Sequence, residues 1–157
     1  MPPTKQYAQL EATIDVAAPP AQVWSLVSDV KRMAEWSPQV ARCTIKGNGV
    51  QKGTKFSNVN RQGLLVWPTN GKVIRFEPHR DFAFRIKENR TVWSFELEPL
   101  DGGGTRITQR RELPDGISSV STALVKVALG GIDKFTDRLR DGMLQTLARI
   151  KAEAEAA

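Results

Sequence analysis

The chain has 157 residues and a net charge of +6, and this length favours a single domain over residues 1–157 with one hydrophobic core. Its single cysteine, Cys43, excludes an intramolecular disulfide, and with only one histidine, His79, no metal site is expected. No apolar run approaches the ~20 residues of a membrane span and no signal peptide is recognised, so we expect a cytoplasmic protein.

The chain begins with a strand and two short helices. Residues 7–16 alternate between apolar and polar side chains, which is typical of a half-buried strand. Prolines at 19 and 20 begin a helix, since proline fits a first helical turn. The next helix, residues 30–35, is predicted to be capped by Asp29 and ended by Pro38.

The middle of the chain, residues 40–113, consists of short predicted strands. Segments such as 82–86 and 91–98 alternate between apolar and polar residues. Clusters of Gly, Pro and Asn predict turns at 47–49, 52–53, 68–71, 77–81 and 101–104. Short strands joined by tight turns favour an antiparallel sheet.

The last predicted element is a long amphipathic helix over residues 131–154. Apolar residues recur every three or four positions and form one stripe, which contains Ile132, Phe135, Leu139, Met143, Leu147 and Ile150. Residues 152–157 are expected to fray. A shorter helix is predicted from about residue 119, with a break at Gly130 and Gly131 that is a candidate hinge for ligand entry; one helix running through both glycines is the alternative.

This order of elements predicts an α+β fold rather than a parallel α/β fold. A curved antiparallel sheet of about seven strands would wrap around the long C-terminal helix, with one face toward the helix and the other toward water. The strand arginines expected on the wet face are Arg75, Arg85, Arg106 and Arg110.

Residues 12–38 and the end of the chain carry a resemblance to a known superfamily. The residues concerned are the strand 12–16, Pro19, Val23, Trp24, Val27, Asp29, the Trp36-Ser37-Pro38 triplet, and Gly142, Leu147, Ile150 and Lys151. They resemble the START-like (SRPBCC) superfamily, specifically its bacterial polyketide cyclase/dehydrase-type members. The resemblance implies a helix-grip fold of seven strands, with a cavity between sheet and helix. Members differ in task, from lipid binding to polyketide cyclisation, so the resemblance implies the fold more strongly than the function.

Side chains on the inner face of the sheet and on the helix stripe are predicted to line the cavity. The apolar candidates are Trp36, Phe56, Trp67, Phe84, Trp93, Phe95, Phe135, Leu139 and Met143, and the polar candidates are Asn58, Gln109 and Arg111. The aromatic residues would serve equally well as packed core, Asn58 as a structural amide, and Trp36 as packing or as a gate. Arg111 is either a rim or salt-bridged residue, or it points inward, where it needs an internal carboxylate or an acidic ligand.

Three functions are compatible with these residues. The first is binding of a small hydrophobic or amphipathic molecule, such as a lipid, fatty acid or polyketide-like compound, with an acidic or carbonyl end near Arg111. The second is a cofactor-independent polyketide aromatase/cyclase or dehydratase, for which no acid–base pair or other catalytic residue stands out. The third is a toxin-like module that binds nucleic acid or protein through the basic sheet face, ranked last because the charges look scattered. No cofactor is expected, and a monomer or a dimer fits equally.

Overall fold

The computed structural model describes residues 9–88, 90–113 and 132–156, and the side chains of 132–136 lie outside this description. The predicted helix near residue 119, the hinge at Gly130 and Gly131, and the side chain of Phe135 therefore fall outside the described residues.

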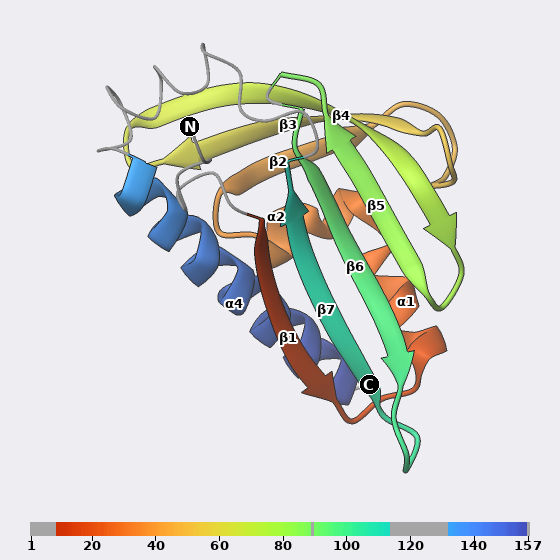
Figure 1. Ribbon diagram of the computed structural model, residues 1–157. Coiled ribbons are helices and arrows are strands. Elements are labelled where there is room, and N and C mark those ends of the chain that lie inside the picture. Colours follow the sequence, from red (N-terminus) through yellow and green to blue (C-terminus); the bar gives the residue numbers. More distant parts are fainter. Residues whose placement is uncertain (1–8, 89, 114–131, 157) are drawn as a thin grey trace.

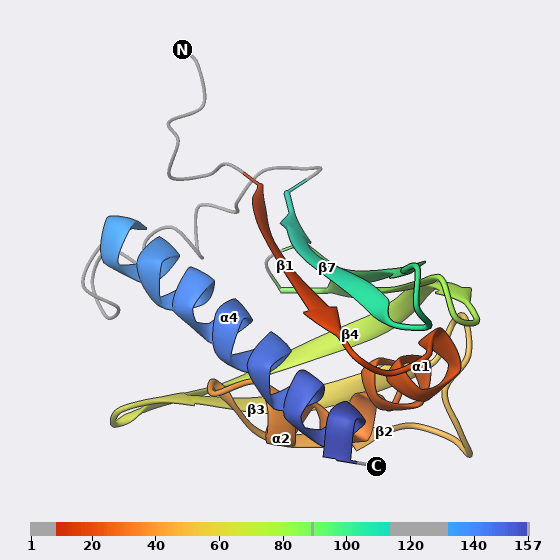
Figure 2. The same cartoon turned by 90° about the horizontal axis from the view of Figure 1, so that it is seen from below.

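Seven strands form one antiparallel sheet in the order β1-β7-β6-β5-β4-β3-β2. The strands are β1 (Leu10–Val16), β2 (Val40–Ile45), β3 (Lys55–Gln62), β4 (Leu65–Glu77), β5 (Asp81–Ile86), β6 (Val92–Pro99) and β7 (Thr105–Glu112). The helices are α1 (Pro20–Val27), the 3-10 helix η2 (Val30–Arg32), α2 (Met33–Trp36) and α4 (Ile132–Ala156). Figures 1 and 2 show the sheet curving around α4, which confirms the predicted helix-grip fold.

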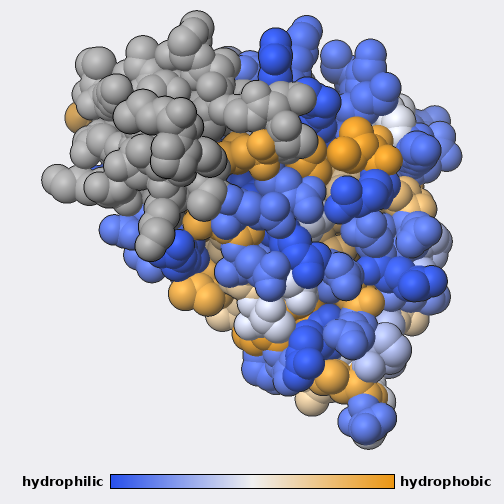
Figure 3. Space-filling model, viewed as in Figure 1, coloured by the Kyte–Doolittle hydropathy of each residue, from blue (hydrophilic) through white to orange (hydrophobic). Residues whose placement is uncertain are grey.

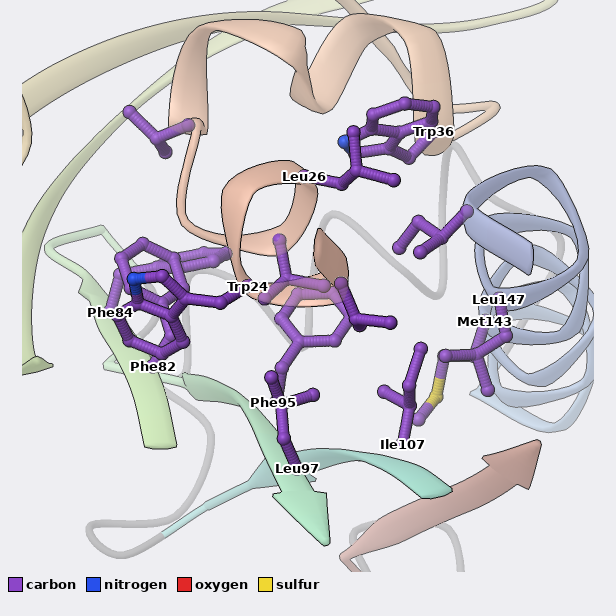
Figure 4. Packing of buried hydrophobic residues seen from close by; sticks show 14 of the residues in the cluster. Trp24, Leu26, Trp36, Phe82, Phe84, Phe95, Leu97, Ile107, Met143 and Leu147 are labelled. Carbon is purple, nitrogen blue, oxygen red and sulfur yellow. The ribbon is translucent and has the colours of Figure 1, made fainter. Parts of the chain in front are cut away.

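The apolar stripe of α4 meets the inner face of the sheet, as its spacing predicts. Leu139, Met143, Leu147 and Ile150 are all buried in the same core as Trp24 of α1. Figure 4 shows Met143 and Leu147 of α4 directed into the interior, beside Ile107 of β7. The inner sheet face therefore supplies the apolar surface that a helix of 25 residues needs.

The C-terminal end of α4 differs from the prediction of fraying over 152–157, because the helix continues to Ala156. Ala154 is buried, and Glu153 makes an ion pair with Arg32 at 2.5 Å. Glu155 accepts a hydrogen bond from the backbone N–H of Ala17 at 2.8 Å. These tertiary contacts hold the last turn against the rest of the fold, which helix composition alone does not reveal.

The predicted turn at residues 68–71 is wrong, since β4 runs through them without interruption. Strand β5 begins to pair with β4 only at Gly71, so residues 65–70 of β4 form ladder pairs with β3 alone. Pro68, which has no backbone N–H to donate, therefore lies where one side of the strand has no partner in β5. A Cβ atom at Gly71 would overlap the ring of Phe56, so this glycine makes room for an aromatic side chain. The hairpin instead turns at Gly63 and Leu64, where Gly63 has a φ of 60°.

The second short helix also differs from its prediction. Residues 30–35 divide into η2 and α2, and Asp29 makes no side-chain capping hydrogen bond. The backbone N–H of Arg32 bonds to the carbonyl of Asp29 at 3.0 Å, which closes a 3-10 turn without help from the carboxylate. Ser37 then adopts an extended conformation before Pro38, so the helix ends where predicted.

The outer face of the sheet carries paired charges over β1, β6 and β7. Arg106 binds Asp15 at 2.8 Å, and Arg110 bridges Glu11 and Glu96 at 2.9 and 2.7 Å. Figure 3 shows this side of the molecule as mostly hydrophilic. Arg106 and Arg110, two of the arginines predicted for the wet face, therefore lie there with carboxylate partners on neighbouring strands.

Candidate ligand-binding site

A cavity lies between the inner face of the sheet, α2 and the middle of α4. The space in which the centre of a water molecule can move is about 140 Å³, and the walls are mostly apolar. Ten of the twelve candidate residues line it: Trp36, Asn58, Trp67, Phe84, Trp93, Phe95, Gln109, Arg111, Leu139 and Met143. The structure thus brings together side chains from one short helix, five strands and the long helix.

Phe56 does not line the cavity. It is 1% exposed and packs against the backbone of Gly71, with its ring centroid 5.2 Å from that of Phe84. Alternation along β3 correctly directs Phe56 inward, but its ring fills the core behind the cavity wall. The other prediction that the structure does not place is Phe135, whose side chain is outside the described residues.

The aromatic wall follows cross-strand pairs of the sheet. Trp93 of β6 lies opposite Phe84 of β5, and Phe95 lies opposite Phe82. Side chains of directly opposite residues lie on the same face of a sheet, so these pairs form one continuous apolar surface. In Figure 4, Phe82, Phe84 and Phe95 extend from the sheet into the interior.

Arg111 is the ionisable group most deeply buried in the wall. It lies on β7 opposite Trp93 of β6 and Leu10 of β1, and it is only 5% exposed. Its guanidinium carbon is 5.9 Å from the centroid of the Trp93 ring, but it makes no ion pair with a described residue. Burial lowers the pKa of Arg111 to about 10. The buried position contradicts the rim location that the sequence leaves open, and the guanidinium has no carboxylate partner among the described residues.

Three further polar atoms of the cavity wall lack a hydrogen-bond partner among the described residues. They are Oδ1 of Asn58, Oε1 of Gln109 and Nε1 of Trp36. Asn58 uses its amide nitrogen only for a weak contact of 3.6 Å with the sulfur of Met33. Buried polar atoms are rarely left unpaired in folded proteins, so these three mark positions where a ligand or water would bond.

Several polar residues of the wall were missed by sequence reasoning, among them Asn60 and Thr69. The amide nitrogen of Asn60 donates to the hydroxyl of Thr69 at 2.9 Å and to the carbonyl of Trp67 at 3.2 Å. Asn60 shares the inward parity of Asn58, so alternation along β3 could have found it. Thr69 was hidden by the incorrect turn at residues 68–71.

The short helix α2 covers one side of the cavity and is fastened to α4. Arg32 lies over the Trp36 ring, with its guanidinium carbon 4.6 Å from the centroid, and bonds both Glu35 and Glu153. Arg149 of α4 donates to the carbonyl of Trp36 at 3.2 Å. Trp36 is therefore held against the cavity by charged residues outside it, and whether it also gates entry remains a prediction.

Few ionisable groups line the cavity. Among the described lining residues they are Asp29, Arg111 and Arg138. Within the same described part of the chain, no three His, Cys, Asp or Glu side chains lie together as a metal site. Cys43 lies outside the cavity wall, and burial raises the pKa of its thiol to about 11. The site therefore combines an apolar wall, the buried cation Arg111, a few uncharged polar groups, and the more exposed charges of Asp29 and Arg138.

Comparison with known proteins agrees with this architecture. A family model described as polyketide cyclase / dehydrase and lipid transport matches residues 7–154. The chain belongs to this family. No curated protein matches this family member in sequence.

Several solved structures share the fold of this polyketide cyclase/dehydrase family member. The Zhui aromatase/cyclase from Streptomyces sp. R1128 aligns with a TM-score of 0.76 and 18% identity, covering 94% of this chain and 93% of that one. The di-domain aromatase/cyclase StfQ of the steffimycin biosynthetic pathway aligns at 0.75 with 15% identity; 94% of this chain is covered, but it spans only 50% of StfQ. A polyketide_cyc-like protein from Corynebacterium glutamicum is 30% identical, with a TM-score of 0.59 and coverage of 91% and 88%.

The helices of this family member are short or amphipathic. Of those in the described part of the chain, none combines the length and the hydropathy that a membrane crossing requires.

Proposed function

We propose that the protein binds a small, largely apolar molecule in the cavity under α4, with an acidic or carbonyl oxygen of the ligand at Arg111. The observation that carries this proposal is a guanidinium that is 5% exposed and has no carboxylate partner among the described residues. A buried charge without a partner destabilises a fold strongly, and an anionic or strongly polar ligand group would remove that penalty.

The remaining wall supports the same ligand class. Trp93, Phe84 and Phe95 offer apolar area to a ring or chain, with about 25 cal/mol gained per Å² removed from water. Asn58 and Gln109 each offer a carbonyl oxygen that has no partner in the described part of the chain and can accept a hydrogen bond from a ligand hydroxyl. The preferred ligand is therefore an amphipathic acid whose apolar body carries one or two hydroxyl groups.

Tryptophan fluorescence tests this proposal directly. Three of the four tryptophans, Trp36, Trp67 and Trp93, line the cavity, so a bound ligand changes their emission. We expect saturable titrations with medium-chain fatty acids or polycyclic aromatic acids. The single variant Trp93→Phe should reduce the signal, while Trp24→Phe, in the core behind the cavity, should retain it. No saturable response to either ligand class would contradict the proposal.

A cofactor-independent cyclase is the second candidate, favoured by family membership and by the folds of the aromatase/cyclases Zhui and StfQ. Arg111 would polarise a ketone of a folded chain, and the amides of Asn58 and Gln109 would orient its enol groups. Asp29 is the single carboxylate among the described lining residues, so positioning and exclusion of water would supply most of the rate enhancement.

Product analysis separates the two candidates. A poly-β-ketone thioester is incubated with the wild-type chain and with Arg111→Met, and mass spectrometry measures ring closure with loss of water. A cyclase should form product faster than the uncatalysed control and lose that rate in the variant. If the chain binds the thioester but does not accelerate ring closure, the result would contradict the cyclase and favour the ligand-binding function.

A further inference from the structure

The excess positive charge of the chain is concentrated in one segment, in contrast to the scattered distribution expected from the sequence. Residues 36–76 contain seven of the 23 Lys and Arg residues and none of the 17 Asp and Glu residues. This segment therefore carries +7, and the remainder of the chain carries −1 to give the net +6. It folds into β2, β3 and β4, at one side of the sheet.

The cations of this segment gather on the outer face of the sheet. Lys55 lies directly opposite Lys72, and Lys72 lies directly opposite Arg85 of β5. Like charges at opposite positions destabilise a sheet, so the pair of Lys55 and Lys72 favours an anionic partner. Six exposed cations of the segment make no ion pair with a described residue: Arg42, Lys46, Lys52, Lys55, Arg61 and Lys72. The arginines of β7, in contrast, are paired with carboxylates.

Exposed aliphatic side chains lie among these cations. Leu64, at the turn of the β3–β4 hairpin, is 100% exposed, and Val66 and Val59 are 52% and 39% exposed. Val66 lies opposite Arg61, and Val59 lies opposite Pro68, so they share the outer face with the cations. The hairpin extends to one side of the described fold in Figure 2, with the exposed Leu64 at its tip.

We propose that the β3–β4 hairpin and the neighbouring β2 form a docking surface for anionic lipid bilayers. Leu64 and Val66 enter the interface between headgroups and acyl chains, while Arg61, Lys55 and Lys72 contact lipid phosphates. A fully exposed leucine and a half-exposed valine at a hairpin tip suit a bilayer better than a nucleic acid. Surfaces that bind single strands stack bases on aromatic rings, whereas Trp67 of this hairpin faces the cavity.

Vesicle flotation with the full chain tests this proposal. Vesicles of phosphatidylcholine alone are compared with an equal mixture of phosphatidylcholine and phosphatidylglycerol, at low and high salt. We expect binding only to the mixture and a loss of binding as salt rises. Leu64→Ser should weaken binding about tenfold, and Lys55→Glu about fivefold or more.

Two matched variants control for general changes in hydropathy and charge. Leu144→Ser removes a leucine of α4 that is 52% exposed, and Lys31→Glu reverses an exposed lysine of η2. Both should bind the mixed vesicles like the wild type. Equal binding to neutral and anionic vesicles, or equal losses in Leu64→Ser and Leu144→Ser, would overturn the proposal. Binding to a labelled oligonucleotide without binding to vesicles would also overturn it and favour a nucleic-acid surface.

Discussion

At the scale of single residues, Arg111 dominates the electrostatics of the cavity. Its neighbours on β6 and β1, Trp93 and Leu10, offer no negative charge. The alternation of β7 predicts that it shares a face with Ile107 and Gln109, but not whether a carboxylate from another element reaches it. That depends on tertiary packing, which brings only Asp29 into the described cavity wall as a carboxylate.

Replacing this buried charge should stabilise the ligand-free fold. Arg111→Met keeps the volume and removes the desolvated guanidinium, so we expect the free energy of unfolding near neutral pH to rise by about 1 kcal/mol or more. The folded-state pKa of Arg111 is lowered, so the unfolded state binds more protons and the contribution of Arg111 to stability increases as pH rises through about 10. The difference in free energy of unfolding between Arg111→Met and the wild type should therefore become smaller above that pH.

Urea unfolding of the wild type and of Arg111→Met, at neutral pH and above about pH 10, measures this difference in stability. Comparing variant with wild type cancels the titration of lysines and of the other groups they share. A variant that is less stable than the wild type by a similar amount at both pH values would show that Arg111 has an internal partner.

At the scale of elements, β4 shows where local sequence signals fail. Pro, Asn and Gly at residues 68–71 predict a turn, but the structure has a strand there. Pro68 is tolerated because β5 does not pair with it, and Gly71 is needed because the ring of Phe56 lies over it. Strand alternation elsewhere and the stripe of α4 were predicted well, because each depends on burial of one face. The predicted cavity residues followed from that parity, while Thr69 did not.

Gly71→Ala should destabilise the fold by about 1–3 kcal/mol, because the new methyl group overlaps the Phe56 ring. In a Phe56→Leu background the same substitution should destabilise the fold by at least about 1 kcal/mol less, which a double-mutant cycle measured by urea unfolding would reveal. Equal effects in both backgrounds would mean that the two residues do not interact.

The ion pairs of Arg32 connect α2 to the end of α4. We expect Arg32→Met to reduce stability by less than about 1 kcal/mol, since both carboxylate partners are partly exposed. The amide of Ser37, which bonds to the carbonyl of Met33 at 2.8 Å, should nevertheless exchange with solvent several-fold faster as α2 loosens.

Hydrogen exchange followed by NMR compares the exchange rate of the Ser37 amide in the wild type and in Arg32→Met. Arg140→Met is the matched control, because the partner of Arg140, Asp137, lies within α4 and not across an interface. Unchanged exchange at Ser37 in Arg32→Met, or the same increase in Arg140→Met, would argue against a role for Arg32 in holding α2.

At the scale of the whole molecule, the fold separates two surfaces of different chemistry. The inner face holds an apolar cavity with a buried arginine, Arg111, that has no ion-pair partner within the described ranges. The outer face of β2–β4 holds exposed cations beside aliphatic side chains. The order of strands and helices predicts an α+β fold with a curved sheet around the long helix, since an amphipathic helix of this length requires a sheet face of matching size. The family resemblance added the helix-grip fold. Which polar atoms remain unpaired depends on side-chain packing, so only the structure identifies Asn58, Gln109 and Trp36 in this role.

The preference of the cavity for an acid tests the central claim most directly. Calorimetry measures the dissociation constants of the tightest-binding acid from the fluorescence titration and of its methyl ester, for the wild type and for Arg111→Met. We predict that the wild type prefers the acid by about tenfold or more, because a charged hydrogen bond contributes roughly 1.5–3 kcal/mol. The variant should bind both compounds alike. An unchanged preference in Arg111→Met, or no preference in the wild type, would contradict the claim that Arg111 receives the acidic end of a ligand.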